Sequence, residues 1–118
     1  MTRLPDWPER LAALITAAEH RPFDAARWNC GRLALAAVAA CIGQQPAWQH
    51  RLSLAEMADT AGFPRMPVPF ARAGDVVLAA DPDRLGVVLD AGRAAFVGSA
   101  GLMRAPITTC AVAWRIGW

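Results

Sequence analysis

The 118-residue chain contains no lysine and no tyrosine, only two histidines, and no apolar run approaching the roughly 20 residues that a membrane-spanning helix needs. We therefore expect no membrane span. No continuous apolar stretch follows the arginine near the N-terminus, and acidic residues occur early, so no secretory signal is visible. This pattern predicts a protein made and kept in the cytoplasm, or assembled there into a larger particle. The formal net charge of +2 is too small to indicate binding to nucleic acid.

The small number of cysteines and histidines excludes several kinds of site. Cys30, Cys41 and Cys110 cannot all pair within one chain. On one straight helix Cys30 and Cys41 would lie about 16 Å apart, beyond disulfide reach, so we expect reduced thiols. No CxxC motif and no Cys/His pair at zinc spacing occurs, which predicts no metal site. There is no glycine-rich phosphate loop or serine nucleophile elbow either, so neither a nucleotide cofactor nor α/β-hydrolase chemistry is expected.

The strongest feature that is present is the apolar segment 28–43, which we interpret as a buried central helix. Asn29 is a typical N-cap and Gly43 a typical residue just past a helix C-terminus. These limits place Cys30 in the first turn, where unpaired backbone N–H groups and the helix dipole favour a thiolate. Cys30 is therefore a candidate nucleophile. The alternative is an ordinary packed cysteine, since free cysteines are among the most often buried residues.

Two further helices are predicted around this one. Residues 9–19 carry apolar side chains at three- and four-residue spacing, typical of an amphipathic helix, and Asp6 is its candidate cap. Ser53 precedes a short helix over residues 54–61 in a capping-box pattern. Three prolines within residues 63–74 favour an extended segment without regular structure.

The C-terminal half predicts strands. Branched and alternating apolar residues separated by turn residues indicate five segments, of which the third and fourth form a hairpin: 75–80, 85–90, 94–97, 102–105 and 110–116. Helices followed by strands predict an α+β fold, with three N-terminal helices packed on a meandering antiparallel sheet of about five strands. We expect the helix over residues 29–42 to be the most buried of the three and to lie across this sheet.

The order of these features resembles that of the NlpC-type papain-fold cysteine peptidases, which cleave peptidoglycan stem peptides. Three short segments carry the resemblance: Asn29-Cys30-Gly31-Arg32-Leu33, Ala73-Gly74-Asp75-Val76-Val77 and Leu85-Gly86-Val87-Val88-Leu89. Three others are similar to a small uncharacterised branch encoded among tail genes of phages, prophages and gene transfer agents: Trp7, Arg21-Pro22-Phe23 and Ala113-Trp114-Arg115. The resemblance implies a papain-like NlpC-type fold and a single NlpC-like domain over residues 1–118.

The resemblance implies a nucleophile, Cys30, but not a complete catalytic site. In this family a histidine at the start of the second strand takes the thiol proton, and a polar residue of the next strand orients it. Here Arg84 and Leu85 hold the place of the histidine, and neither is a base at neutral pH. His20 and His50 both precede that strand, so either could serve only in a rearranged site. An exposed position at a helix end is the ordinary explanation of His20.

The sequence leaves two main functions open. The missing base favours a degenerate, inactive papain-fold domain that acts as a structural or adaptor protein at the tip or hub of a phage-like tail. Trp48 and Trp118 are candidate contact residues for other tail proteins, although partial burial in the core explains them equally well. The alternative is an active cysteine peptidase or amidase, with Cys30 and a non-standard base, that binds and cuts peptidoglycan during cell-wall penetration. A binding module for a small amide-bearing ligand is a third possibility.

Overall fold

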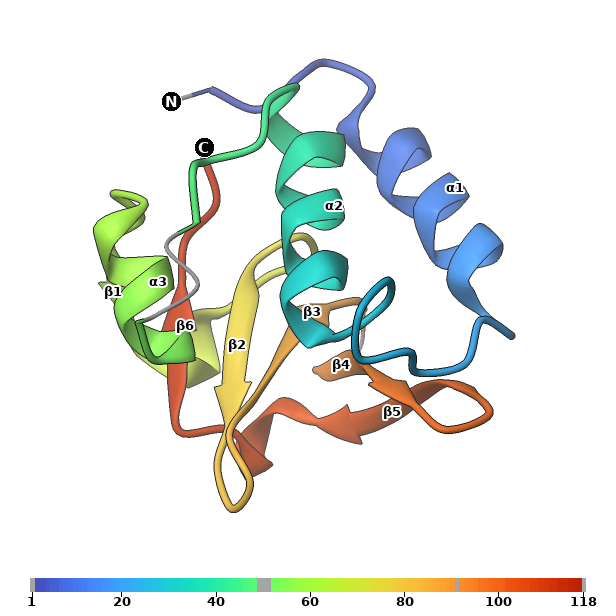
Figure 1. Cartoon of the computed structure of the whole chain (residues 1–118). Helices are drawn as coiled ribbons and strands as arrows, with labels where there is room; N and C mark the ends of the chain where they lie inside the picture. Colours follow the sequence, from blue (N-terminus) through green and yellow to red (C-terminus); the bar gives the residue numbers. More distant parts are fainter. Residues whose placement is uncertain (1, 49–51, 91, 118) are drawn as a thin grey trace.

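The computed structural model describes residues 2–48, 52–90 and 92–117. Its helices are α1 (Trp7–Ala18), α2 (Cys30–Ile42) and α3 (Leu54–Thr60), and they precede a six-stranded antiparallel sheet. Figure 1 shows α2 crossing in front of the sheet, with α1 on one side of it and α3 on the other. The predicted α+β class and the three helices are therefore confirmed. Among the described residues, no helix combines the length and the apolar character required to span a membrane.

The sheet is not a simple meander. Its strands are β1 (Arg65–Met66), β2 (Val76–Ala79), β3 (Arg84–Val88), β4 (Arg93–Gly98), β5 (Gly101–Pro106) and β6 (Val112–Trp114), and they lie in the order β1-β6-β2-β3-β4-β5. The hairpin predicted from the sequence is β4 and β5, joined at Gly98 and Gly101. The last strand, however, does not continue beyond β5. It returns to the opposite side of the sheet and pairs with both β1 and β2.

The proline-rich segment 63–74 is more regular than predicted, and it supplies the sixth strand. Arg65 and Met66 pair with Trp114 and Ala113 of β6. Both residues keep their backbone N–H groups because the prolines lie on either side of them, so a two-residue edge strand is compatible with this sequence. A 3₁₀ turn, Val68–Phe70, follows. The expectation of about five strands and an irregular segment was wrong for this reason.

Helix α2 forms the centre of the structure, as predicted. Asn29 caps it in an extended conformation, and Gly43 ends it with φ of 82°, a left-handed conformation that glycine adopts without strain. Helices α1 and α3 bury two residues each, whereas α2 buries six: Leu33, Ala34, Ala37, Val38, Ala40 and Cys41. The prediction that α2 is the most buried helix is confirmed. Asp6 occupies the N-cap position of α1, as predicted, but its side chain makes no capping hydrogen bond.

Side chains of the sheet alternate between two apolar layers. Trp114 and Leu85 belong to the cluster that includes residues of α2, whereas Ala113 and Val88 belong to a cluster on the other face, which the two 3₁₀ turns cover. The second turn is Ile107–Thr109. The core therefore has one layer on each face of the sheet.

An ion pair at the outer edge joins α3 to β1. The Asp59 carboxylate accepts hydrogen bonds from Arg65 Nε and Nη2, at 2.9 and 2.8 Å, and from Trp114 Nε1 at 2.8 Å. The hydrogen bonds from Arg65, and secondly that from Trp114, hold the pKa of Asp59 below its usual value of 3.8. Both charged side chains remain substantially exposed.

Candidate functional site

Cys30 is the first residue of α2, in the position that the sequence predicted. The preceding residue fixes this start, because Asn29 Oδ1 accepts a hydrogen bond from Arg32 N at 3.0 Å. Asn29 Nδ2 in turn donates to the Ala25 carbonyl at 3.1 Å, which holds the loop before α2 against the helix. Both polar atoms of the Asn29 side chain therefore have structural partners.

The Cys30 side chain is half-buried and lines a cavity of about 350 Å³. Its described walls come from the loop before α2, from the first turns of α2, and from Trp48 and residues of α3. Leu54 and Met57 of α3 close one side of it. A thiol in an open cavity at a helix N-terminus is accessible to reagents and substrates, which is the geometry that a cysteine nucleophile requires.

A base is missing from the described walls of this cavity. Within residues 2–48, 52–90 and 92–117, the lining contains no histidine, aspartate or glutamate. His20 is exposed just beyond α1, and its Cα lies against the Gly101 end of the β4–β5 turn. His20 is not among the described lining residues, and His50 falls outside the described part of the chain. The prediction that neither histidine reaches the sulfur therefore stays a prediction.

The two residues at the position where the resemblance to NlpC-type peptidases leads one to expect a histidine, Arg84 and Leu85, point to opposite faces of the sheet. Leu85 is fully buried in the same cluster against which Cys30 packs. The Arg84 guanidinium instead lies 5.3 Å from the centre of the Phe96 ring and donates to the Pro82 carbonyl at 3.1 Å. Phe96 belongs to the far layer of the core. Alternation along β3 thus puts an apolar side chain, not a cation, on the Cys30 side of the sheet.

The other two cysteines differ from Cys30. Cys41 is completely buried on α2, and burial raises the pKa of its thiol. Cys110 is half-buried after the second 3₁₀ turn, and burial is also the main reason that its pKa is raised. All three are free thiols. Across the described ranges, no group of three or more His, Cys, Asp or Glu side chains is arranged to hold a metal ion.

The predicted contact residues Trp48 and Trp118 have different outcomes. Trp48 lines the Cys30 cavity and is half-buried, and its indole N–H has no hydrogen-bond partner among the described residues. It is thus part of the cavity wall and packs against the core. Trp118 lies outside the described residues.

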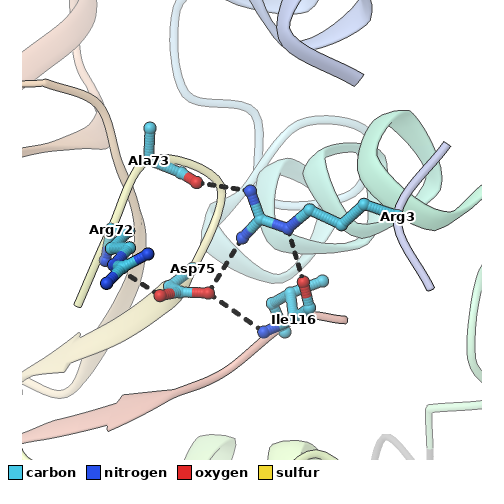
Figure 2. A network of polar contacts seen from close by, with 5 residues as sticks. All are labelled: Arg3, Arg72, Ala73, Asp75 and Ile116. Carbon is cyan, nitrogen blue, oxygen red and sulfur yellow. Dashed lines mark hydrogen bonds and ion pairs between the residues drawn. The ribbon is translucent and has the colours of Figure 1, made fainter. Parts of the chain in front are cut away.

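Sequence reasoning missed a buried carboxylate beside the Gly-Asp turn. Asp75 is 2% exposed, and its two oxygens accept three hydrogen bonds: from Arg3 Nη2 at 3.0 Å, from Ile116 N at 3.0 Å and from Arg72 N at 2.9 Å. Figure 2 shows the carboxylate between the N-terminal segment, the turn and the C-terminal end of the chain. An acidic residue directly before a run of valines was the signal in the sequence, because such a group must find partners when it is buried.

Arg3 completes this network, which we call the Arg3–Asp75 network. Its Nε donates to the Ile116 carbonyl at 2.8 Å, and its Nη1 donates to the Ala73 carbonyl at 2.7 Å. Gly74 has φ of +90°, and a Cβ there would lie 2.8 Å from Arg3 Nη1. The turn therefore needs glycine for its backbone conformation and also for the approach of the guanidinium. These contacts join both ends of the described chain to β2.

Comparison with known proteins identifies a family. A family model with the description "Domain of unknown function (DUF6950)" matches residues 2–58 and 49–116, which together cover nearly the whole chain. No curated protein matches the sequence. Since the match extends from the Arg3–Asp75 network through the Cys30 cavity to β6, the chain belongs to the family described as domain of unknown function DUF6950.

Proposed function

We propose that this protein is a non-catalytic domain of papain-like, NlpC-type fold that serves as a structural or adaptor protein of a phage-like tail. One observation carries the first part of the proposal. Cys30 opens into a cavity whose described walls contain no histidine, aspartate or glutamate, and Leu85, which lies on that side of the sheet, is apolar and buried. A thiol without a base lacks the group that would take its proton, and such losses typically reduce hydrolysis by several orders of magnitude.

The fold supports the proposed kinship in outline. A cysteine begins a helix that packs on an antiparallel sheet, and the Gly74-Asp75 turn leads into β2. These are the features, in this order, on which the resemblance to the NlpC-type peptidases rests. The assignment to a tail rests on the similarity of residues around Trp7, Arg21 and Trp114 to the branch encoded with tail genes.

These residues have structural roles in the chain. The Trp7 ring lies under the Arg3 guanidinium, and the Trp28 ring lies under that of Arg21, each at 4.3 Å from the ring centre. Trp114 is completely buried. Residues that maintain a scaffold are what a structural protein of this branch would retain.

An active cysteine peptidase is the second candidate, and the open position of the Cys30 thiol favours it. The deciding experiment incubates purified peptidoglycan with the wild type, Cys30→Ala and His50→Ala, followed by chromatography of released stem peptides. We expect no release by any of the three proteins. Release by the wild type that both substitutions abolish would overturn the non-catalytic proposal and identify the base. Circular dichroism of each variant checks that the fold is intact.

The adaptor role has its own test. Mass spectrometry of purified phage-like particles from cells that encode this protein should find it in a fixed ratio to known tail proteins. A protein that is abundant in the lysate but missing from intact particles would contradict the tail assignment.

A further inference from the structure

A second cavity, of about 480 Å³, lies where the N-terminal segment, the segment leading into β2 and the C-terminal end of the chain meet. Figure 1 shows that the two ends of the chain approach each other at this side of the molecule. Arg3, Arg72 and Arg115 line it together with the aromatic residues Trp7 and Phe70. None of its described lining residues belongs to the Cys30 cavity. This arginine-rich cavity is therefore a separate site.

The charges in this cavity are not balanced. Asp75 is the acidic residue in its described lining, and all three hydrogen bonds to its carboxylate come from within the wall (Figure 2). Arg3 neutralises this carboxylate and uses three of its five N–H groups for the network. The exposed guanidinium groups of Arg72 and Arg115 have no acidic partner among the described residues. Within the described part of the chain, two positive charges of this cavity therefore lack an acidic partner.

An exposed aromatic ring lies beside these charges. Phe70 is 67% exposed at the end of the first 3₁₀ turn, and it is one of the few large apolar side chains on the described surface. Trp7 is half-buried in the same cavity, under the Arg3 guanidinium. Arginine and large aromatic residues are the types that dominate binding energy at protein interfaces. Nucleic acid would require a longer basic surface to follow its backbone than two free guanidinium groups provide.

We propose that the arginine-rich cavity docks an acidic peptide segment of a partner protein. Carboxylates of the peptide pair with Arg72 and Arg115, for which bidentate geometry is favourable, and an apolar side chain next to them packs on Phe70. This inference rests on the proposed adaptor function, because it names the surface and the partner chemistry by which the domain would be held in a larger assembly.

Fluorescence anisotropy tests the proposal with a fluorescein-labelled peptide that contains one phenylalanine between two runs of three glutamates. At an ionic strength of about 0.1 M, where the screening length is about 10 Å, the double variant Arg72→Gln/Arg115→Gln should weaken binding about tenfold, as expected for two ion pairs at the surface. The control, Arg27→Gln/Arg93→Gln, changes the net charge equally at two exposed residues outside the cavity. It should weaken binding less than about twofold, because the distant charges are screened.

A second comparison tests the role of the ring. Phe70→Ala should weaken binding of the phenylalanine-containing peptide but not of the same peptide with alanine in its place. No binding by the wild type, equal losses in the two double variants, or equally tight binding of an oligothymidylate with the same number of charges would each overturn the proposal.

The two proposals fail separately. A protein that binds the peptide and also cleaves peptidoglycan keeps the docking site and loses the non-catalytic function. One that neither binds nor cleaves loses the docking site alone. Unchanged circular dichroism spectra are expected for the substitutions of Arg72 and Arg115, since neither side chain has a hydrogen bond to a described residue.

Discussion

Removal of the Asp75 carboxylate should destabilise the fold more than any other change of a single charged group described above. Its side chain is 3% exposed and that of Arg3 is 12% exposed, so water cannot replace the missing oxygen atoms. Asp75→Ala leaves the Arg3 guanidinium without its acidic partner and the Ile116 N–H without an acceptor. Breaking one side of a buried ion pair costs about 3 to 5 kcal/mol in the free energy of unfolding.

Asp75→Asn should cost somewhat less, about 2 to 4 kcal/mol. Asparagine keeps one oxygen acceptor, but its NH₂ group takes the place of the other carboxylate oxygen. That NH₂ group must then face a hydrogen-bond donor, which is either Arg72 N or the pair formed by Arg3 Nη2 and Ile116 N. Against a typical domain stability of about 5 to 15 kcal/mol, either substitution removes a large fraction of the total.

Urea unfolding followed by tryptophan fluorescence measures this loss, provided that the slope of the transition stays constant. Asp83→Asn is the matched control, since Asp83 is exposed in the turn before β3 and should change stability by less than about 0.5 kcal/mol. A double-mutant cycle with Arg3→Met should show coupling of at least about 1 kcal/mol between the two side chains. A loss below about 1 kcal/mol for Asp75→Ala would refute the idea that this network holds the ends of the chain on the sheet.

Three further predictions concern the thiols, the Gly-Asp turn and acid stability. Iodoacetamide should modify Cys30 at least about tenfold faster than Cys41 in the native protein, because Cys30 lines an open cavity whereas Cys41 is fully buried with a raised pKa. Peptide mass spectrometry measures both rates. Equal protection of the two thiols would show that Cys30 is an ordinary core residue. Gly74→Ala should lower the free energy of unfolding, measured by chemical denaturation, by about 1 to 3 kcal/mol more than Gly62→Ala. Both positions have positive φ, but only a Cβ at Gly74 would meet other atoms, among them the Cys41 sulfur at 2.9 Å. Similar losses for the two variants would mean that backbone strain alone matters. Because the folded-state pKa of Asp59 is lowered, its stabilising effect is present above pH 3.8 and is lost as the pH falls through the lower folded value. Asp59→Asn should therefore reduce the pH dependence of the free energy of unfolding below pH 3.8, by less than about 1 kcal/mol at so exposed a site. An unchanged pH dependence would contradict this assignment.

The elements that could be predicted are those defined by local patterns. Helix α2 has a capping asparagine, a long apolar stretch and a terminal glycine, and each of these acts within a few residues of its position. The β4–β5 hairpin likewise has its turn between its strands. The place of β6 could not be read in this way, because nothing within Val112–Trp114 specifies a partner between β1 and β2.

The same distinction between local and distant contacts applies to the candidate site. Cys30 at the start of a helix follows from local sequence, whereas the walls of its cavity come from segments up to α3 that only the folded chain brings together. The partner of Asp75 is Arg3, 72 residues away, so a turn motif at Gly74 could not reveal that the carboxylate is buried and paired. The arginine-rich cavity was missed for the same reason, since Arg3, Arg72 and Arg115 are remote in sequence.

The position of β6 has a consequence for synthesis on the ribosome. The strand that joins β1 to β2 is the last to be made, and residues as far as Ile116 are needed for the contacts to Arg3 and Asp75. Until that point, β1 and β2 lack the strand that lies between them, because contacts so distant in sequence must wait for the chain to close. We expect the sheet to close only after residue 116 has left the ribosome, and cellular chaperones to engage the nascent chain until then.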